Sequence, residues 1–90
     1  MQKVIFSPGL RRLTGQQAVY QTAQHGLSEI LSELAGHFPQ LAAELRQLQS
    51  GKASALRVFV GPQDVTAAIN SLGPLPSESN ILIFHPVSGG

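Results

Sequence analysis

The spacing of apolar residues changes twice along the 90-residue chain, and each change predicts a change of secondary structure. Residues 3–7 are rich in β-forming side chains and stop at the turn signal Pro8-Gly9. Apolar and polar residues then alternate over 16–23, which predicts a second strand. We expect these two strands to pair as a hairpin, with residues 10–15 as the loop between them.

From Leu27 the apolar spacing becomes that of an α-helix. Positions i, i+3, i+4, i+7, i+8 and i+11 form one stripe, made of Leu27, Ile30, Leu31, Leu34, Ala35 and Phe38. Gly26 stands at the N-cap position, and Pro39 must end or restart the helix. A second, shorter amphipathic helix is predicted over 41–48, with Gly51 as its terminating residue.

The remainder of the chain returns to strand-like patterns. Residues 56–60 alternate as a strand and are followed by the turn 61–64. Residues 65–72 fit either a short helix or an extended connection. The run 81–84 is apolar throughout, which indicates a central strand covered on both faces.

This order of elements predicts the α+β class, with a mixed four- to five-stranded sheet packed on one main helix and a short second helix. If the first and last strands lie side by side at the centre, the last strand carries the chain past the rim of the sheet. Pro86 ends the ladder there, because proline has no N–H to donate. We therefore predict a folded domain over 1–85 and a flexible tail over 86–90.

Composition argues against several classes of function. Six basic and five acidic residues leave no basic surface for nucleic acid. The absence of cysteine excludes disulfides and thiolate chemistry. No apolar run reaches the length of a membrane span, and the apolar start is too short for a signal peptide, so we expect a cytoplasmic protein.

The sequence also lacks the patterns of an enzyme. Its three histidines are far apart and have no metal-ligand spacing. No phosphate-binding loop and no serine nucleophile motif is present. Glu29 and Glu33 share one helix face at i, i+4, which is typical of a solvated surface. We expect a protein that is not an enzyme and binds neither a metal nor a cofactor.

The unusual chemistry of the chain lies at its end, where Gly89-Gly90 follows the last strand closely. Two residues without side chains can pass through a channel that excludes bulkier residues, and they adopt backbone angles closed to others. This suits a protein whose own C-terminal carboxylate is a substrate. The alternative is a frayed end, because termini are commonly disordered.

Three segments carry a resemblance to a known family: residues 31–39, residues 57–60 and the terminal stretch 81–90. Together they resemble the MoaD/ThiS group of sulfur-carrier proteins, which have the ubiquitin-like β-grasp fold. Gly61-Pro62 stands where the family often has Asn-Gly, and Ser79-Asn80 stands where it usually has Gly-Asp. Both departures fall in loops, so they bear on the subfamily and leave the fold unaffected.

The resemblance implies a role for the C-terminus. An E1-like adenylyltransferase, using ATP and Mg, would join the carboxylate of Gly90 to AMP. A sulfur donor would then convert it to a thiocarboxylate, for use by a downstream acceptor enzyme. The residues that thread into the partner would be Pro86, Val87, Ser88 and Gly89.

Docking of these partners is expected on the sheet face turned away from the helices. Phe59 leads the candidates because it is out of phase with its apolar neighbours, and Phe84 and Phe6 or Ile5 join it. Two other functions stay open. One is a ubiquitin-like modifier conjugated through Gly90 to lysines, and the other is an interaction module that shares only the fold.

Overall fold

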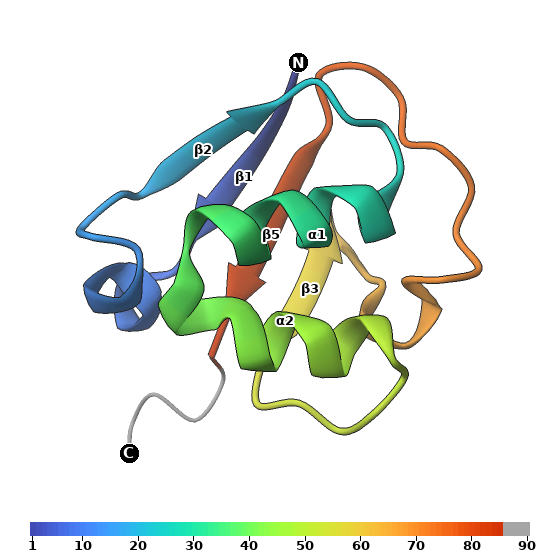
Figure 1. Ribbon diagram of the computed structural model, residues 1–90. Helices are drawn as coiled ribbons and strands as arrows, with labels where there is room; N and C mark the ends of the chain where they lie inside the picture. Colours follow the sequence, from blue (N-terminus) through green and yellow to red (C-terminus); the bar gives the residue numbers. More distant parts are fainter. Residues whose placement is uncertain (86–90) are drawn as a thin grey trace.

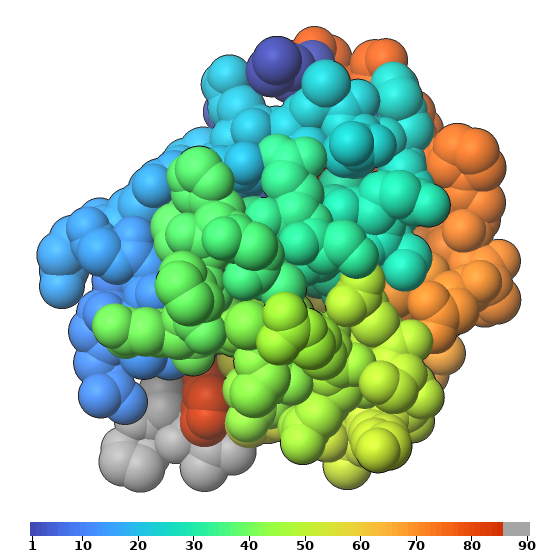
Figure 2. All heavy atoms as spheres, in the orientation of Figure 1, coloured from blue at the N-terminus to red at the C-terminus, as the bar shows by residue number. Residues whose placement is uncertain are grey.

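A five-stranded mixed sheet, in the order β2-β1-β5-β3-β4, carries two α-helices on one face (Figure 1). The structure is a computed structural model and describes residues 1–85. The strands are β1 (Gln2–Phe6), β2 (Val19–Thr22), β3 (Arg57–Val60), β4 (Gln63–Asp64) and β5 (Asn80–Phe84). The helices are α1 (Leu27–His37) and α2 (Ala42–Gln49), with 3-10 turns η1 (Pro8–Leu13), η2 (Pro39–Leu41) and η3 (Thr66–Ala68). Residues of α1 and α2 form the centre of the face seen in Figure 2.

The first and last strands lie side by side at the centre of the sheet, as predicted. β1 and β5 run parallel, with Val4 opposite Ile81 and Phe6 opposite Ile83. Antiparallel neighbours flank the pair, β2 beside β1 and β3 beside β5. The prediction that β5 is covered on both faces is wrong. Leu82 is only half-buried, because the helices cover one face alone.

The helical stripe predicted from the sequence is the core-facing side of α1. Leu27, Ile30 and Leu31 are at most 1% exposed, as is Leu34. Phe38 ends the helix as its C-cap residue and packs edge-on against Phe6, with 5.3 Å between ring centroids. The helix is therefore held by burial rather than by capping, since its N-cap Gly26 has no side chain to donate or accept.

The connections differ most from the sequence-based prediction. The 3-10 turn η1 spans the expected turn at Pro8-Gly9 and residues 10–13 of the expected loop over 10–15. The second strand begins only at Val19, because Gly15 and Gln16 adopt φ angles of 67° and 70°, which are incompatible with a strand. The predicted turn 61–64 contains the short strand β4, which pairs with β3. The open question over 65–72 is answered by the 3-10 turn η3.

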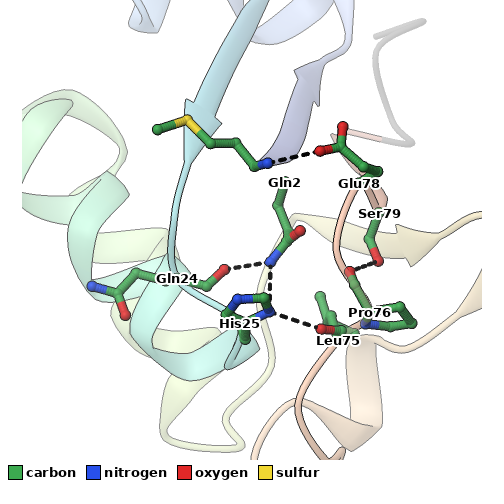
Figure 3. Close-up of polar contacts among 8 residues, drawn as sticks. Gln2, Gln24, His25, Leu75, Pro76, Glu78 and Ser79 are labelled. Carbon is green, nitrogen blue, oxygen red and sulfur yellow. Dashed lines mark hydrogen bonds and ion pairs between the residues drawn. The ribbon is translucent and has the colours of Figure 1, made fainter.

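Polar contacts hold the long connection before β5 against the start of the chain (Figure 3). The N-terminal ammonium group lies 2.9 Å from Glu78. The ring nitrogen Nδ1 of His25 lies 3.1 Å from the carbonyl oxygen of Leu75, whose own N–H donates back to the carbonyl of His25. The side-chain Nε2 of Gln2, which is fully buried, lies 3.2 Å from the same ring nitrogen; this nitrogen accepts from Gln2 in one tautomer and donates to Leu75 in the other. These contacts bring β5 into register beside β1.

A second polar cluster ties the edge strand β2 to α1. The hydroxyl of Tyr20 donates to the carboxylate of Glu33, and Thr22 donates to its other oxygen at 3.0 Å. The ring of Tyr20 also packs against that of Phe38, with 5.7 Å between centroids. The prediction of a solvated face is therefore wrong for Glu33, which is half-buried, and correct for Glu29, which is exposed.

We expect Leu34→Ala to lower the free energy of unfolding by about 2–5 kcal/mol, because it leaves a cavity under the sheet. Urea denaturation followed by circular dichroism measures the change. Val19→Ala is the control, since Val19 is 41% exposed and its truncation should change stability by no more than about 0.5 kcal/mol. Equal stability of Leu34→Ala and wild type would contradict the assignment of α1 to the core.

Tyr20 is the single tyrosine of a chain without tryptophan, so its ionisation can be read from ultraviolet absorbance alone. The hydrogen bond to Glu33 raises the pKa of Tyr20 above its ordinary value of 10.0. We expect Glu33→Gln to bring the midpoint of the Tyr20 titration back toward that value, and Glu29→Gln to leave the midpoint unchanged. A raised pKa means that the folded state holds the proton more tightly. The contribution of the Tyr20 proton to stability is therefore complete below the pKa that Tyr20 has in the unfolded state. It is lost as pH rises through the pKa of Tyr20 in the folded state.

If the titration midpoint of Tyr20 is the same in Glu33→Gln as in the wild type, the hydrogen bond from Tyr20 of β2 to Glu33 of α1 is absent in solution.

Candidate functional site

The sheet face without helices carries a continuous apolar row. The backbone register places Val19 opposite Ile5, Ile5 beside Leu82, and Leu82 opposite Phe59. Phe84 lies on the same face two residues after Leu82, and its ring centroid is 5.6 Å from that of Phe59. We call these five side chains the open-face patch. Val19 is exposed and the other four are half-buried, which leaves apolar area in contact with solvent.

Charged residues border the open-face patch on the β3–β4 side. Asp64 stands opposite Phe59 and Arg57 stands opposite Phe84, and the two charged side chains form an ion pair. Thr66 donates to Asp64 from its hydroxyl at 2.7 Å and from its backbone N–H at 2.9 Å. These hydrogen bonds, together with Arg57, lower the pKa of Asp64 to about 2, so this carboxylate is ionised at neutral pH. An apolar centre with a polar rim is the usual composition of a protein-binding surface.

The structure places the three aromatic candidates on different sides of the sheet. Phe59 and Phe84 lie together on the open face, in the strand phase predicted for them. Their role in partner binding stays a prediction. The assignment of Phe6 to this surface is wrong, because Phe6 is fully buried against the helices. Ile5, the alternative at this strand, lies on the open face next to Leu82.

Two members of the open-face patch, Leu82 and Val19, were not predicted from the sequence. Leu82 alternates with Ile81 and Ile83, so the period of two in a strand places it with Phe84. That signal was present but was hidden by the continuous apolar run. The placement of Val19 depends on the pairing of β2 with β1, for which the sequence gives no register.

The terminal residues Pro86, Val87, Ser88, Gly89 and Gly90 lie outside the described residues. The structure does describe the place from which they leave. β1 and β5 are parallel and therefore end at the same rim of the sheet, where the N–H of Ser7 donates to the carbonyl of Ile83 at 3.1 Å. This rim is opposite the N-terminus in Figure 1. Phe84 is the last residue of β5, so the open-face patch extends to the point where the chain leaves the sheet.

Within residues 1–85, no group of three or more His, Asp or Glu side chains is placed to hold a metal ion. The helices of this part of the chain are also too short and too polar to cross a membrane.

No model of a known protein family matches the chain, and no curated protein matches its sequence. Solved structures do resemble it. The solution structure of the Haloferax volcanii HVO 2177 protein has a TM-score of 0.73 and 18% identity, covering 99% of this chain and 85% of that one. The crystal structure of SAMP1 from Haloferax volcanii has a TM-score of 0.68 and 19% identity, covering 99% of this chain and 98% of that one.

These similarities span nearly the whole chain and show that it has the ubiquitin-like β-grasp fold, which confirms the predicted fold class. Identities below one fifth show the fold alone, because one fold supports many functions.

Proposed function

We propose that this chain is a sulfur carrier: its C-terminal Gly90 is activated by an E1-like adenylyltransferase and converted to a thiocarboxylate. The observation that carries the proposal is the open-face patch, which runs across the sheet and reaches the end of β5. A partner docked on this patch holds the β-grasp domain beside the point where the chain continues toward Gly89-Gly90.

The chemistry follows from the state of the terminal carboxylate. Its ordinary pKa is about 3.3–3.7, so it is an anion at neutral pH and a poor acyl donor. Attack of a carboxylate oxygen on the α-phosphorus of ATP forms an acyl-adenylate and releases pyrophosphate. Hydrosulfide supplied by a sulfur donor then attacks the acyl carbon, displaces AMP and leaves the thiocarboxylate. ATP, Mg and the catalytic groups belong to the partner.

A ubiquitin-like modifier is the second candidate and shares the first step. Its acyl group passes to the amine of a lysine on another protein and forms an isopeptide bond. The fold is the same for both functions, so the fate of the activated Gly90 distinguishes them.

Phe59→Ala should weaken binding to the activating enzyme by about 1–4 kcal/mol, as expected when a partly desolvated aromatic anchor is truncated. Calorimetric titration with the E1-like enzyme of the same organism measures the affinity. The control is Tyr20→Phe. Tyr20 points toward α1 and away from the open-face patch, and the substitution keeps its aromatic ring. If Phe59→Ala unfolds readily while its folded fraction binds as tightly as wild type, Phe59 is a core residue and the patch is not the docking surface.

Removal of Gly90, or addition of a tryptophan after it, should abolish adenylation and leave the circular dichroism spectrum unchanged. The reacting carbon must come within about 3–3.5 Å of its attacker at the end of a narrow channel, which a shorter or bulkier end prevents. The control is Lys52→Gln, which keeps both glycines and changes an exposed residue outside the tail and the open-face patch. Pyrophosphate release with the E1-like enzyme measures the step.

Mass spectrometry of the intact protein then separates the two candidates. After incubation with the E1-like enzyme, ATP, Mg and sulfide, a carrier has one oxygen replaced by sulfur. It returns to its starting mass when the acceptor takes the sulfur. Recovery from cells of mainly isopeptide adducts through Gly90 would overturn the carrier and establish the modifier.

A further inference from the structure

A cavity of about 670 Å³ lies at the rim of the sheet where β5 ends. It is bounded by η1, by the start of α2, by the residues just before β3 and by His85, the last described residue. In Figure 1 η1 lies at this rim, next to the end of β5. Its wall includes Leu10, Arg11, Arg12, Leu41, Glu44 and His85. We call this space the exit cavity.

Two cations line the exit cavity without an acidic partner. Arg11 and Arg12 are consecutive in η1, and neither forms an ion pair with any of the residues 1–85. The Nε–H of Arg11 is buried and has no hydrogen-bond acceptor in this part of the chain. A buried guanidinium N–H without a partner is costly, so an acceptor supplied at this position would lower the free energy of the site.

Among residues 1–85, Glu44 is the one acidic residue of the cavity wall, and its carboxylate is already hydrogen-bonded. Glu44 accepts hydrogen bonds through Oε1 from the hydroxyl of Ser54 at 2.9 Å and from the N–H of Ala55 at 3.1 Å. Its carboxylate therefore fixes the segment before β3 and forms no ion pair with either arginine. Two arginines against one carboxylate leave the described wall with a net positive charge, which favours an anion.

The loop that carries the arginines is held in one geometry. The carbonyl oxygen of Arg11 accepts from the N–H of Thr14 at 3.1 Å, from its hydroxyl at 3.1 Å and from the N–H of Gln16 at 2.7 Å. Gln16 adopts a φ of 70°, a left-handed conformation that is unfavourable for a residue with a side chain. A binding site built on such a loop loses little conformational entropy when it is occupied.

Buried apolar side chains stand beside the arginines in the cavity wall. They include Leu10, Leu41 and Leu56, each at most 1% exposed. Two guanidinium groups suit a carboxylate, such as that of glutamate, since arginine binds carboxylates through two parallel hydrogen bonds.

We propose that the exit cavity binds an acidic segment of a protein partner, with Arg11 and Arg12 holding its carboxylates. The inference rests on the proposed function for the identity of that partner, the activating enzyme. The position supports this occupant, because Phe84 of the open-face patch and His85 of the exit cavity are consecutive residues. The two surfaces therefore flank the point where the chain leaves the sheet, and one partner can contact both.

The test is a titration of the full-length, isotope-labelled chain with an acetylated hexaglutamate peptide, followed by NMR. We expect the Nε–H signals of Arg11 and Arg12 to move. The double variant Arg11→Gln/Arg12→Gln should weaken the affinity about tenfold or more, because two charge-assisted contacts are lost. Arg46→Gln/Lys52→Gln is the matched control: it removes the same charge from positions outside the cavity and should leave the affinity nearly unchanged.

Three results would overturn the proposal. Equal weakening in both double variants would show attraction to net charge alone. Inorganic sulfate that moves the same signals and binds as tightly as the peptide would show a small-anion site. A shift of the Arg11 Nε–H signal on amidation of the C-terminus, without peptide, would identify the chain's own carboxylate as the occupant.

Failure of this inference can be told from failure of the carrier function. Removing Gly89 and Gly90 should abolish adenylation and leave peptide binding intact. If the full-length chain binds the peptide but is never adenylated, only the proposed carrier function is overturned. A different pair of results would overturn only the proposal that the exit cavity binds an acidic segment. In that case the wild type does not bind the peptide, and Arg11→Gln/Arg12→Gln is adenylated with the KM of the wild type.

Discussion

The parallel pairing of β1 with β5 is the constraint on which the rest of the molecule depends. It joins the two ends of the folded chain, residues 2–6 and 80–84. Parallel neighbours cannot be connected by a tight turn, so the whole of the intervening chain must cross from one end of the sheet to the other. Packing of α1 and α2 over one face stabilises that crossing, and the polar contacts of Gln2 and His25 complete the register.

A consequence of this arrangement is that both central strands end at the same rim. The segment after β1 is η1, and the residue after β5 is His85, so the two line one cavity at this rim. The cations Arg11 and Arg12 therefore share a wall with a residue that is more than seventy positions away in the sequence. The rim from which the chain continues toward Gly90 is thus formed by the same elements that close the fold.

The sheet also has two unlike faces, and β5 contributes to both. Ile81 and Ile83 are fully buried under the helices, while Leu82 and Phe84 extend the open-face patch. Residues of β5 alternate between the core and the open-face patch. A substitution in this strand that changes binding therefore lies next to residues that stabilise the core. Asp64, Arg57 and Thr66 border the patch with a hydrogen-bonded polar group that keeps it distinct from the rest of the surface.

The sequence by itself determined the helical stripe, the strand at each end of the domain and the α+β class. These follow from periodicity, which is a local property: a spacing of 3.6 or of two is visible without knowing what the element packs against. The same reasoning placed Phe59 in the correct phase, because β3 alternates clearly between Val58 and Val60.

Tertiary structure alone decided which face of β1 is buried, and so distinguished Phe6 from Ile5, because three consecutive apolar residues carry no phase. It also decided the role of Glu33, whose partners Tyr20 and Thr22 belong to another element. The exit cavity could not be predicted from the sequence either. Arg11 and His85 line the same cavity only because parallel strands end at a common rim, and that proximity is a property of the folded chain.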